Sequence, residues 1–209
     1  MLRARVVLLA GPSGSGKSYV ARHTGLPVLP LDDFYLNGDD PRLPRGDGPV
    51  DWESPTSWDA TAAVAAIELL ARTGTVEVPH YDISVDRCTG YERLDLADAP
   101  LFVAEGIFAA EIVRVCRDHE LLADAYALRR PRPVTFVRRL ARDLTEHRKP
   151  PATLVRRGIA LYHAESRVLA RQAMLGCRPA SAGTVRREIA ARVTVGDMSP
   201  ARPVAYRPR

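Results

Sequence analysis

Residues 11–18 read Gly-Pro-Ser-Gly-Ser-Gly-Lys-Ser and match the pattern G-x-x-x-x-G-K-[ST] in full. In this pattern the N–H groups of a glycine-rich loop surround phosphate oxygens. The lysine reaches the β- and γ-phosphates, and the hydroxyl ligates Mg²⁺. We therefore expect Lys17 and Ser18 to fill these two roles. The residues expected to cradle the phosphates are Gly11, Ser13, Gly14, Ser15, Gly16, Lys17 and Ser18.

Other nucleotide-binding patterns fit the loop poorly. A dinucleotide loop, G-x-G-x-x-G, fails because Tyr19 occupies the position of its last glycine. A GTPase switch is disfavoured because D-x-x-G occurs nowhere in the chain. The GTPase element N-K-x-D is absent as well, since the chain has lysines only at positions 17 and 149. The loop therefore favours phosphoryl-transfer chemistry on a nucleoside triphosphate.

Carboxylates that could complete such a site follow two apolar runs of the sequence. Phosphoryl transfer needs a second metal anchor and a base for the acceptor hydroxyl. In a doubly wound sheet these groups lie at the carboxyl ends of strands. Asp32 and Asp33 end one short apolar run, and Glu105 ends another. We expect these carboxylates to face the loop, with Asp33 equally able to serve as a turn cap.

Strands alternating with helices must position these groups, which predicts an α/β fold with a parallel sheet and helices on both faces. An apolar strand precedes the loop and a helix follows it, as in P-loop NTPases. The strand order is not readable from this pattern. The expected strands are 5–10, 27–31, 75–85, 101–104 and 123–128. The expected helices are 17–23, one capped by Thr56 or Ser57 and ended by Gly74, one spanning Phe108 to Leu122, 134–146 and 152–175.

Length and charge bound the organisation of the chain. Its 209 residues suit one domain, expected over 1–195, followed by a flexible tail over 196–209. Residues 129–157 contain ten basic and two acidic residues, a net charge of +8, and are expected to form a helical lid. This segment favours a local anion site over a nucleic-acid surface, because Phe136 is its sole aromatic residue.

Composition also bears on the compartment and on partners. No apolar stretch approaches the roughly 18 residues of a membrane span, and the apolar start is too short for a signal peptide. The three cysteines are Cys88, Cys116 and Cys177; they lie far apart and form no C-x-x-C pair. We therefore expect a cytoplasmic protein that acts on a small molecule, with neither a membrane nor a nucleic acid as partner.

Five further elements, in order, resemble the uridine kinase family, P-loop nucleoside kinases related to phosphoribulokinase. The resemblance runs from Val6 to Arg157, about three quarters of the chain. It is carried by Asp32-Asp33-Phe34-Tyr35, an altered Asp51-Trp52-Glu53-Ser54-Pro55, Pro79-His80-Tyr81-Asp82, Ala104-Glu105-Gly106-Ile107 and Arg138-Arg139-Leu140-Ala141-Arg142-Asp143.

The resemblance implies a role for each matching residue. Asp32 would accept the proton of a ribose 5′-hydroxyl and help to hold Mg²⁺, and Glu105 would be the second metal carboxylate. Tyr81 would flank the nucleobase. The remaining implied contacts are Tyr35 on the substrate, Glu53 on the ribose hydroxyls, and Arg139 and Arg142 over the transferring phosphate.

One departure from the family affects the choice of substrate. Members carry a histidine five residues after the tyrosine, at the edge of the base, where this chain has Asp86. A carboxylate cannot donate to a carbonyl oxygen, so Asp86 would disfavour uracil O4 and suit an amino or cationic group. Alternatively, Asp86 points to solvent and selects nothing.

The implied activity is Mg²⁺-dependent transfer from ATP or GTP to the 5′-hydroxyl of uridine or cytidine. The alternatives are a nicotinamide riboside kinase, another small-metabolite kinase, or a non-catalytic nucleotide-binding regulator. Glu53 could also be a solvated surface acid, because its extra methylene changes its reach, and Trp52 a loop anchor. The phosphate donor and the oligomeric state are not readable from the sequence.

Overall fold

A parallel β-sheet forms the centre of the computed structural model, which describes residues 2–43, 50–130, 166–195 and 199. Five strands within these residues pair in the order β2-β5-β1-β6-β7, each parallel to its neighbours. They are β1 (Arg5–Ala10), β2 (Val28–Pro30), β5 (Leu101–Glu105), β6 (Leu122–Leu128) and β7 (Arg178–Ala180). The α/β class and the parallel sheet expected from the sequence are confirmed.

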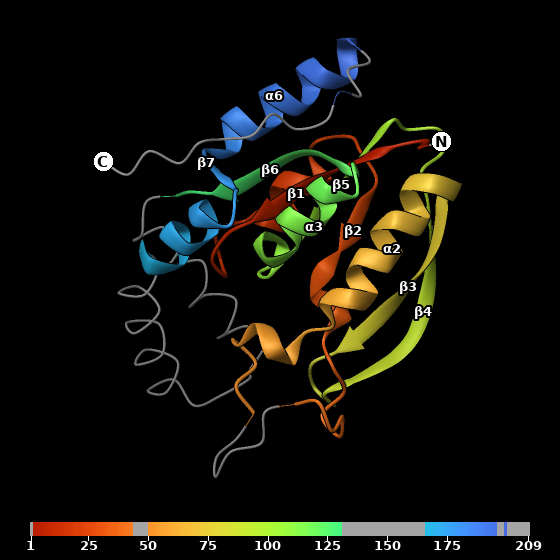
Figure 1. Cartoon of the computed structure of the whole chain (residues 1–209), viewed down its shortest axis with the longest axis vertical. Helices are drawn as coiled ribbons and strands as arrows, with labels where there is room; N and C mark the ends of the chain where they lie inside the picture. The colour runs from red at the N-terminus through yellow and green to blue at the C-terminus, as the bar shows by residue number, and fades with distance from the viewer. Residues whose placement is uncertain (1, 44–49, 131–165, 196–198, 200–209) are drawn as a thin grey trace.

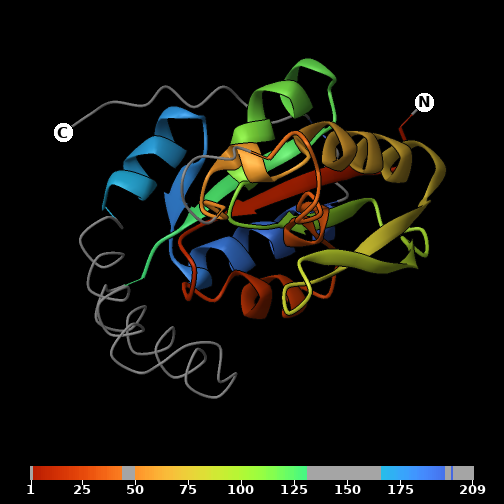
Figure 2. The same cartoon turned by 90° about the horizontal axis from the view of Figure 1, so that it is seen from below.

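Helices cover both faces of this sheet, as Figure 2 shows. They are α1 (Lys17–Arg22), α2 (Ala60–Thr73), α3 (Val113–Asp118) and α6 (Ala182–Val195), with short 3₁₀ turns η1 (Leu31–Phe34), η2 (Pro55–Ser57) and η3 (Ala109–Ile112). Residues 166–174 are helical as well. The chain therefore has the three-layer organisation that alternating strands and helices predict.

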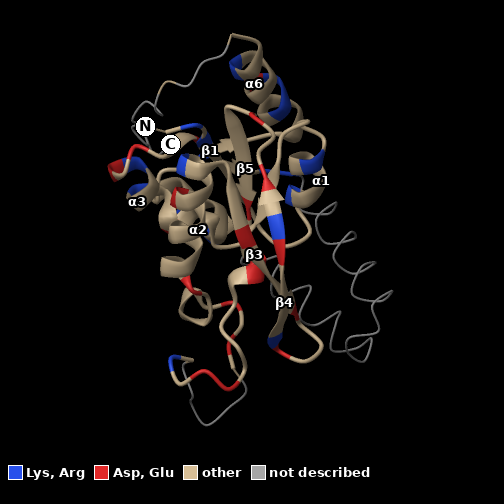
Figure 3. Ribbon diagram, turned by 90° about the vertical axis from the view of Figure 1, so that its right-hand side faces the viewer, with Lys and Arg blue, Asp and Glu red and all other residues tan. Residues whose placement is uncertain are grey.

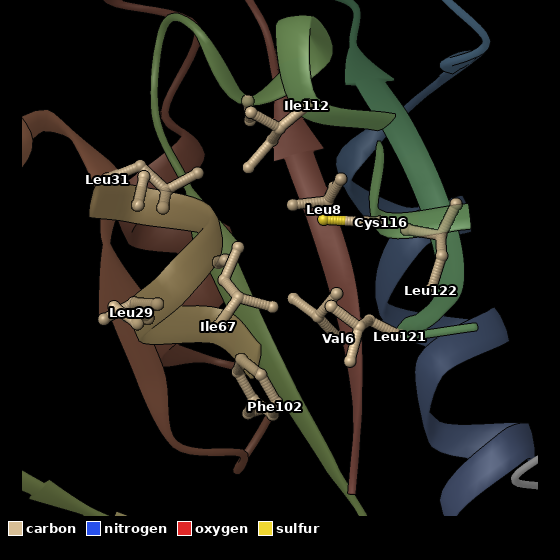
Figure 4. Packing of buried hydrophobic residues seen from close by; sticks show 14 of the residues in the cluster. Val6, Leu8, Leu29, Leu31, Ile67, Phe102, Ile112, Cys116, Leu121 and Leu122 are labelled. Carbon is tan, nitrogen blue, oxygen red and sulfur yellow. The ribbon is translucent and has the colours of Figure 1, made fainter. Parts of the chain in front are cut away.

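The central strand β1 is buried on both faces because its side chains alternate between two cores. Val6 and Leu8 pack with Ile67 of α2 and with residues of α3, as the close view in Figure 4 shows. Val7 and Leu9 pack on the other face, against α1 and α6. Each fully buried side chain of this kind contributes about 1.5–3 kcal/mol, so β1 and the loop that follows it are held firmly in place.

A two-stranded antiparallel hairpin extends beside the sheet (Figure 1). It consists of β3 (Thr75–Asp82) and β4 (Arg87–Asp95). The sequence predicts one strand over 75–85, but the strand ends at Asp82 and β4 was not expected. The reason is that β4 is almost wholly exposed and lacks the alternation of apolar and polar residues that marks a half-buried strand.

Two expected helix boundaries are wrong. Asp59, and not Thr56 or Ser57, caps α2, since its carboxylate accepts a hydrogen bond from the Ala62 N–H at 2.9 Å. Gly74 ends that helix as expected, with a left-handed φ of 88°.

The helix expected from Phe108 to Leu122 is also wrong in extent. It is split into η3 and the short α3, and Leu122 begins β6. The sequence pattern does not mark the end of this helix, because the first apolar residue of the buried strand β6 continues the helical spacing of apolar residues.

The expectations at the carboxyl-terminal end fall partly outside the described residues. The predicted helix over 134–146, the first part of 152–175, most of the lid over 129–157, and almost all of the tail over 196–209 lie there. Within the described part, the helix over 166–174 stops just before Gly176, whose φ is 101°. The edge strand β7 and helix α6 then follow, and neither was predicted.

Candidate active site at the carboxyl ends of the parallel strands

Strand register brings the phosphate loop and the two carboxylates together. Glu105 at the end of β5 lies in register with Leu9 of β1 and with Pro30 of β2. The loop that begins at Gly11 leaves β1 two residues later, and Asp32 follows β2 by two residues. Parallel strands present their carboxyl ends at one edge, so all three groups meet at the edge where ligands bind in such sheets.

Lys17 is anchored inside the glycine loop. Its side chain is buried, and its ammonium group donates a hydrogen bond to the carbonyl of Gly11 at 3.1 Å. The loop turns at Gly16, whose φ of 88° is left-handed and favours glycine. The Ser15 hydroxyl is buried there without a hydrogen-bond partner among the described residues. A buried donor of this kind needs a partner, so the loop is suited to receive oxygens from a ligand.

Glu105 is the buried carboxylate of the site. Burial raises the pKa of its carboxyl group, while the positive charge of Lys17 and a hydrogen bond from the Ser18 hydroxyl oppose this rise. Its Oε2 atom is buried with no hydrogen-bond partner among the described residues. Glu105 therefore lies beside both chemically important residues of the loop, and one of its oxygens remains available.

Asp32 is exposed and closely positioned over Gly106. Its Oδ1 atom accepts a hydrogen bond from the Ile107 N–H at 2.9 Å. A Cβ on Gly106 would stand 2.8 Å from that oxygen and 2.8 Å from the Cβ of Leu31. Only glycine leaves room for this approach, so the residue after Glu105 helps to place Asp32. The Asp32 carboxylate also lies near enough to Glu105 for its charge to raise the Glu105 pKa.

These oxygens fit a magnesium ion. Mg²⁺ in nucleotide sites is held by one or two carboxylates, with waters and phosphates completing the shell. The unpartnered Glu105 oxygen, the Ser18 hydroxyl and Asp32 are hard oxygen ligands of that kind. Across the described residues no set of three or more His, Cys, Asp or Glu side chains could bind a metal unaided. A metal here would therefore depend on oxygens of the nucleotide as well.

Asp33 contacts the hairpin, unlike the adjacent Asp32. Its Oδ1 atom accepts a hydrogen bond from the backbone N–H of Tyr81 at 3.2 Å. Burial raises the pKa of the Asp33 carboxyl group, and the hydrogen bond from Tyr81 opposes this. The two adjacent aspartates thus have distinct environments, which the sequence alone could not distinguish.

Aromatic rings gather around Tyr35, in the segment that follows Asp32 and Asp33. The ring of Tyr35 lies 5.9 Å from Trp52, 5.7 Å from Tyr81 and 5.9 Å from Phe108, measured between centroids. The Tyr35 hydroxyl donates to the Trp52 carbonyl, and the Tyr81 hydroxyl donates to the Leu36 carbonyl. Because both hydroxyls bind backbone, a ligand here would meet mainly ring faces and edges. Trp52 was expected to anchor a loop, and its packing against Tyr35 and Tyr81 is an unexpected part of this group.

Asp86 lies at the turn of the hairpin, next to this group. Its backbone is left-handed, with φ at 49°, and its carbonyl accepts a hydrogen bond from the Gly38 N–H at 2.7 Å. Burial raises the pKa of Tyr81 to about 12, and the charge of Asp86 adds to the effect. Asp86 is half-buried and electrostatically coupled to Tyr81.

The other expected substrate contacts are less clearly placed. Glu53 is exposed, and its backbone N–H donates to the Asp51 carboxylate at 3.0 Å, which fixes the local turn. Arg139 and Arg142 fall in the range 131–165, outside the described residues. The structure therefore brings Lys17, Ser18, Asp32 and Glu105 together in one group, and Tyr35, Tyr81 and Asp86 in a second group beside the hairpin turn.

Comparison with known proteins supports the fold. The chain matches no protein-family model and no curated protein. A proposed fructose transport system kinase from Silicibacter sp. TM1040 superimposes with a TM-score of 0.59, at 21% identity, over 80% of this chain and 85% of that one. YFH7 of Saccharomyces cerevisiae, a proposed P-loop-containing kinase with a circular permutation, gives a TM-score of 0.61 at 11% identity, over 86% and 93%.

A proposed uridine kinase from Bacillus stearothermophilus is also similar, with a TM-score of 0.47 at 21% identity over 72% of this chain and 85% of that one. The two higher-scoring superpositions show that the chain has the fold of P-loop kinases. Within the described ranges, none of the helices has both the length and the apolar character that crossing a membrane requires.

Proposed function

We propose that this protein is a Mg²⁺-dependent kinase that transfers the γ-phosphoryl group of ATP or GTP to a hydroxyl of a small acceptor. The observation that carries the proposal is the convergence of Lys17, Ser18, Glu105 and Asp32 at one sheet edge. A nucleotide cradle alone would serve a binding protein equally well. Phosphoryl transfer also requires a base for the acceptor hydroxyl, and the exposed Asp32 carboxylate, held beside the buried Glu105 carboxylate that could bind a metal, provides one.

The proposed reaction assigns one task to each group. Asp32 takes the proton of the acceptor hydroxyl while that oxygen forms a bond to the γ-phosphorus. The bond from the γ-phosphorus to the β–γ bridging oxygen breaks, and the nucleoside diphosphate leaves. Lys17 holds the β- and γ-phosphate oxygens. Ser18 and Glu105, aided by Asp32, would hold Mg²⁺, which supplies charge stabilisation to the phosphates when it is bound. Arg139 and Arg142 are proposed to contact the transferring group.

The acceptor proposed is a nucleoside, phosphorylated on its 5′-hydroxyl. The half-buried rings of Tyr35 and Trp52, which pack on the buried ring of Tyr81, offer aromatic contacts to a planar base, and such contacts are each worth about 1–3 kcal/mol. Glu53 is proposed to contact the ribose hydroxyls. Cytidine and uridine are the leading candidates, as the resemblance implies.

Charge favours an acceptor without a phosphate of its own. The described residues 32–43 and 50–59, which include Asp32, Asp33 and Tyr35, contain seven acidic residues and one arginine. Acidic residues gather on these loops, as Figure 3 shows. A sugar phosphate would meet repulsion there, whereas a neutral or cationic nucleoside would not. The charge of Asp86, which reaches Tyr81, specifically favours nicotinamide riboside as a second candidate, because its ring is cationic.

The test is a phosphoryl-transfer screen with ATP and GTP against cytidine, uridine, nicotinamide riboside and several sugar phosphates. We expect Mg²⁺-dependent turnover with at least one nucleoside and none with sugar phosphates. Turnover confined to sugar phosphates would overturn the nucleoside assignment. Tight nucleotide binding without transfer to any acceptor would overturn the kinase proposal and identify a nucleotide-binding regulator.

A further inference from the structure

Arg130 lies against the phosphate loop although it is remote from it in sequence. Strand β6 pairs with β1 as far as Ala10 and Ala127, so the residues after Leu128 emerge beside the loop that leaves β1. The backbone N–H of Arg129 donates to the carbonyl of Ala180 in β7 at 2.9 Å, which fixes the start of this segment. The position of Arg130 is therefore set by the sheet.

The guanidinium group of Arg130 lies directly over Gly16. A Cβ on Gly16 would stand 3.4 Å from Nη2, 3.6 Å from Nε and 3.7 Å from Cζ of that arginine. All three distances are van der Waals contacts, so the plane of the guanidinium group covers the glycine that precedes Lys17.

One nitrogen of the Arg130 guanidinium group, Nε, is buried without a hydrogen-bond partner among the described residues. A buried donor without a partner is unfavourable, and native structures usually supply such a group with a water, an ion or a ligand. The Ser15 hydroxyl of the same loop is likewise buried and unpartnered. The phosphate loop and the arginine that lies over it thus each contain one buried polar atom without a hydrogen-bond partner in the described part of the chain.

The charges near the Ser15 hydroxyl and the Arg130 Nε atom indicate which ligand would supply their hydrogen bonds. A nucleoside triphosphate brings several negative charges, and Lys17 already has the Gly11 carbonyl and the Glu105 carboxylate as neighbours. A planar guanidinium group presents several N–H donors in a geometry that matches phosphate oxygens. From this arrangement we infer that Arg130 contacts the phosphates of the donor nucleotide, as a second cation added to the loop from the end of β6.

This inference rests on the proposed function but concerns binding, so it can be tested without an acceptor. The affinity of wild type for ADP, ATP and inorganic tripolyphosphate is measured by titration calorimetry and compared with Arg130→Gln and Arg130→Lys. The control is Arg114→Gln, which removes a positive charge from α3 where the side chain is 89% exposed. Thermal unfolding of each variant shows whether the fold is retained.

We expect Arg130→Gln to bind ADP, ATP and tripolyphosphate about ten- to a hundredfold more weakly, the effect of losing one charge-assisted contact. Arg130→Lys should recover part of the loss, and Arg114→Gln should match wild type. Unchanged affinity for tripolyphosphate would overturn the inference. Weaker binding of ATP with unchanged binding of tripolyphosphate would also overturn the inference, because that result would place the guanidinium group against the base and not against the phosphates. If the wild-type protein binds ADP but phosphorylates no acceptor, the kinase proposal is refuted, and the contact of Arg130 with phosphates is still tested by the binding measurements.

Discussion

The two halves of the candidate site are built on different supports. The donor half, residues 11–18 with Glu105, lies at the ends of central strands whose side chains are buried on both faces. The half proposed to bind the acceptor, residues 33–38 with Trp52 and the hairpin turn 81–88, is held by ring contacts and hydrogen bonds between separate segments of the chain. Tyr81 N–H binds Asp33, and Cys88 N–H binds the Asn37 side chain at 2.8 Å.

Under the proposed function, this difference would separate the residues of phosphoryl transfer from those that select the acceptor. Strand register fixes the donor half, and many buried contacts would have to change to move it. The hairpin supports the acceptor half, and because its outer strand β4 is mostly exposed, few buried contacts resist a change on that strand. If the protein is the proposed kinase, we therefore expect substitutions in the hairpin to change the choice of acceptor and to leave the residues of the donor half in place. The predictions below either strengthen this division or break it.

The largest effect is expected at Lys17. Replacing Lys17 with Ala removes the positive charge that faces the β- and γ-phosphates, and we expect kcat/KM to fall by about a thousandfold or more. The decline should be the same for every acceptor, because the loss belongs to the donor half. Steady-state kinetics with two acceptors measure it, and circular dichroism checks the fold. Retention of most of the turnover would contradict the assignment of the loop.

The carboxylates come next. Asp32→Asn and Glu105→Gln keep shape and remove charge, and each should lower kcat by about a hundredfold or more. Glu105→Gln should also raise the Mg²⁺ concentration needed for half-maximal rate, and chelation of the metal should stop turnover in the wild type. Asp33→Asn is the matched control, because an amide oxygen still accepts the bond from Tyr81. Equal losses at Asp32 and Asp33 would show that the wrong aspartate carries the reaction.

The donor half was largely predictable because its signals are local. Lys17 and Ser18 belong to one eight-residue pattern, and Glu105 ends a run of buried apolar residues that could only be an interior strand. The register that unites them with Asp32 follows from parallel strands ending at one edge. The order of those strands was not predictable, since it depends on packing between distant segments.

The acceptor half was less predictable because its contacts join residues far apart in the chain. The bond between Tyr81 and Asp33 spans 48 positions, and no local pattern announces it. The exposed strand β4 and the short edge strand β7, which contains Pro179, lack apolar periodicity. Arg130 was counted within a basic segment, and its position over Gly16 depends on the pairing of β6 with β1.

A substitution at Asp86 should change which nucleoside the protein prefers and should leave phosphoryl transfer itself intact. If its carboxylate faces the base, it favours cytidine, which offers an amino group, over uridine, which offers a carbonyl. Asp86→His should shift the ratio of kcat/KM for cytidine over uridine toward uridine by about ten- to a hundredfold. Asp86→Asn is the control for charge, and both side chains tolerate the left-handed backbone at this position. A ratio that stays constant in both variants would remove Asp86 from the site.

The smallest effect expected is at Asp33, and it tests the division most directly. Asp33→Ala deletes the acceptor of the Tyr81 N–H bond, which ties the hairpin to the segment that follows Asp32. A partly buried bond of this kind contributes about 1 kcal/mol, so the KM for the acceptor should rise about fivefold. The KM for ATP and kcat should stay near wild type, because neither Lys17 nor Glu105 depends on the hairpin. Asp33→Asn, which keeps the bond, should restore the acceptor KM. If Asp33→Ala instead weakens ATP binding as strongly as acceptor binding, the two halves are coupled through the hairpin, and specificity could not change independently of transfer.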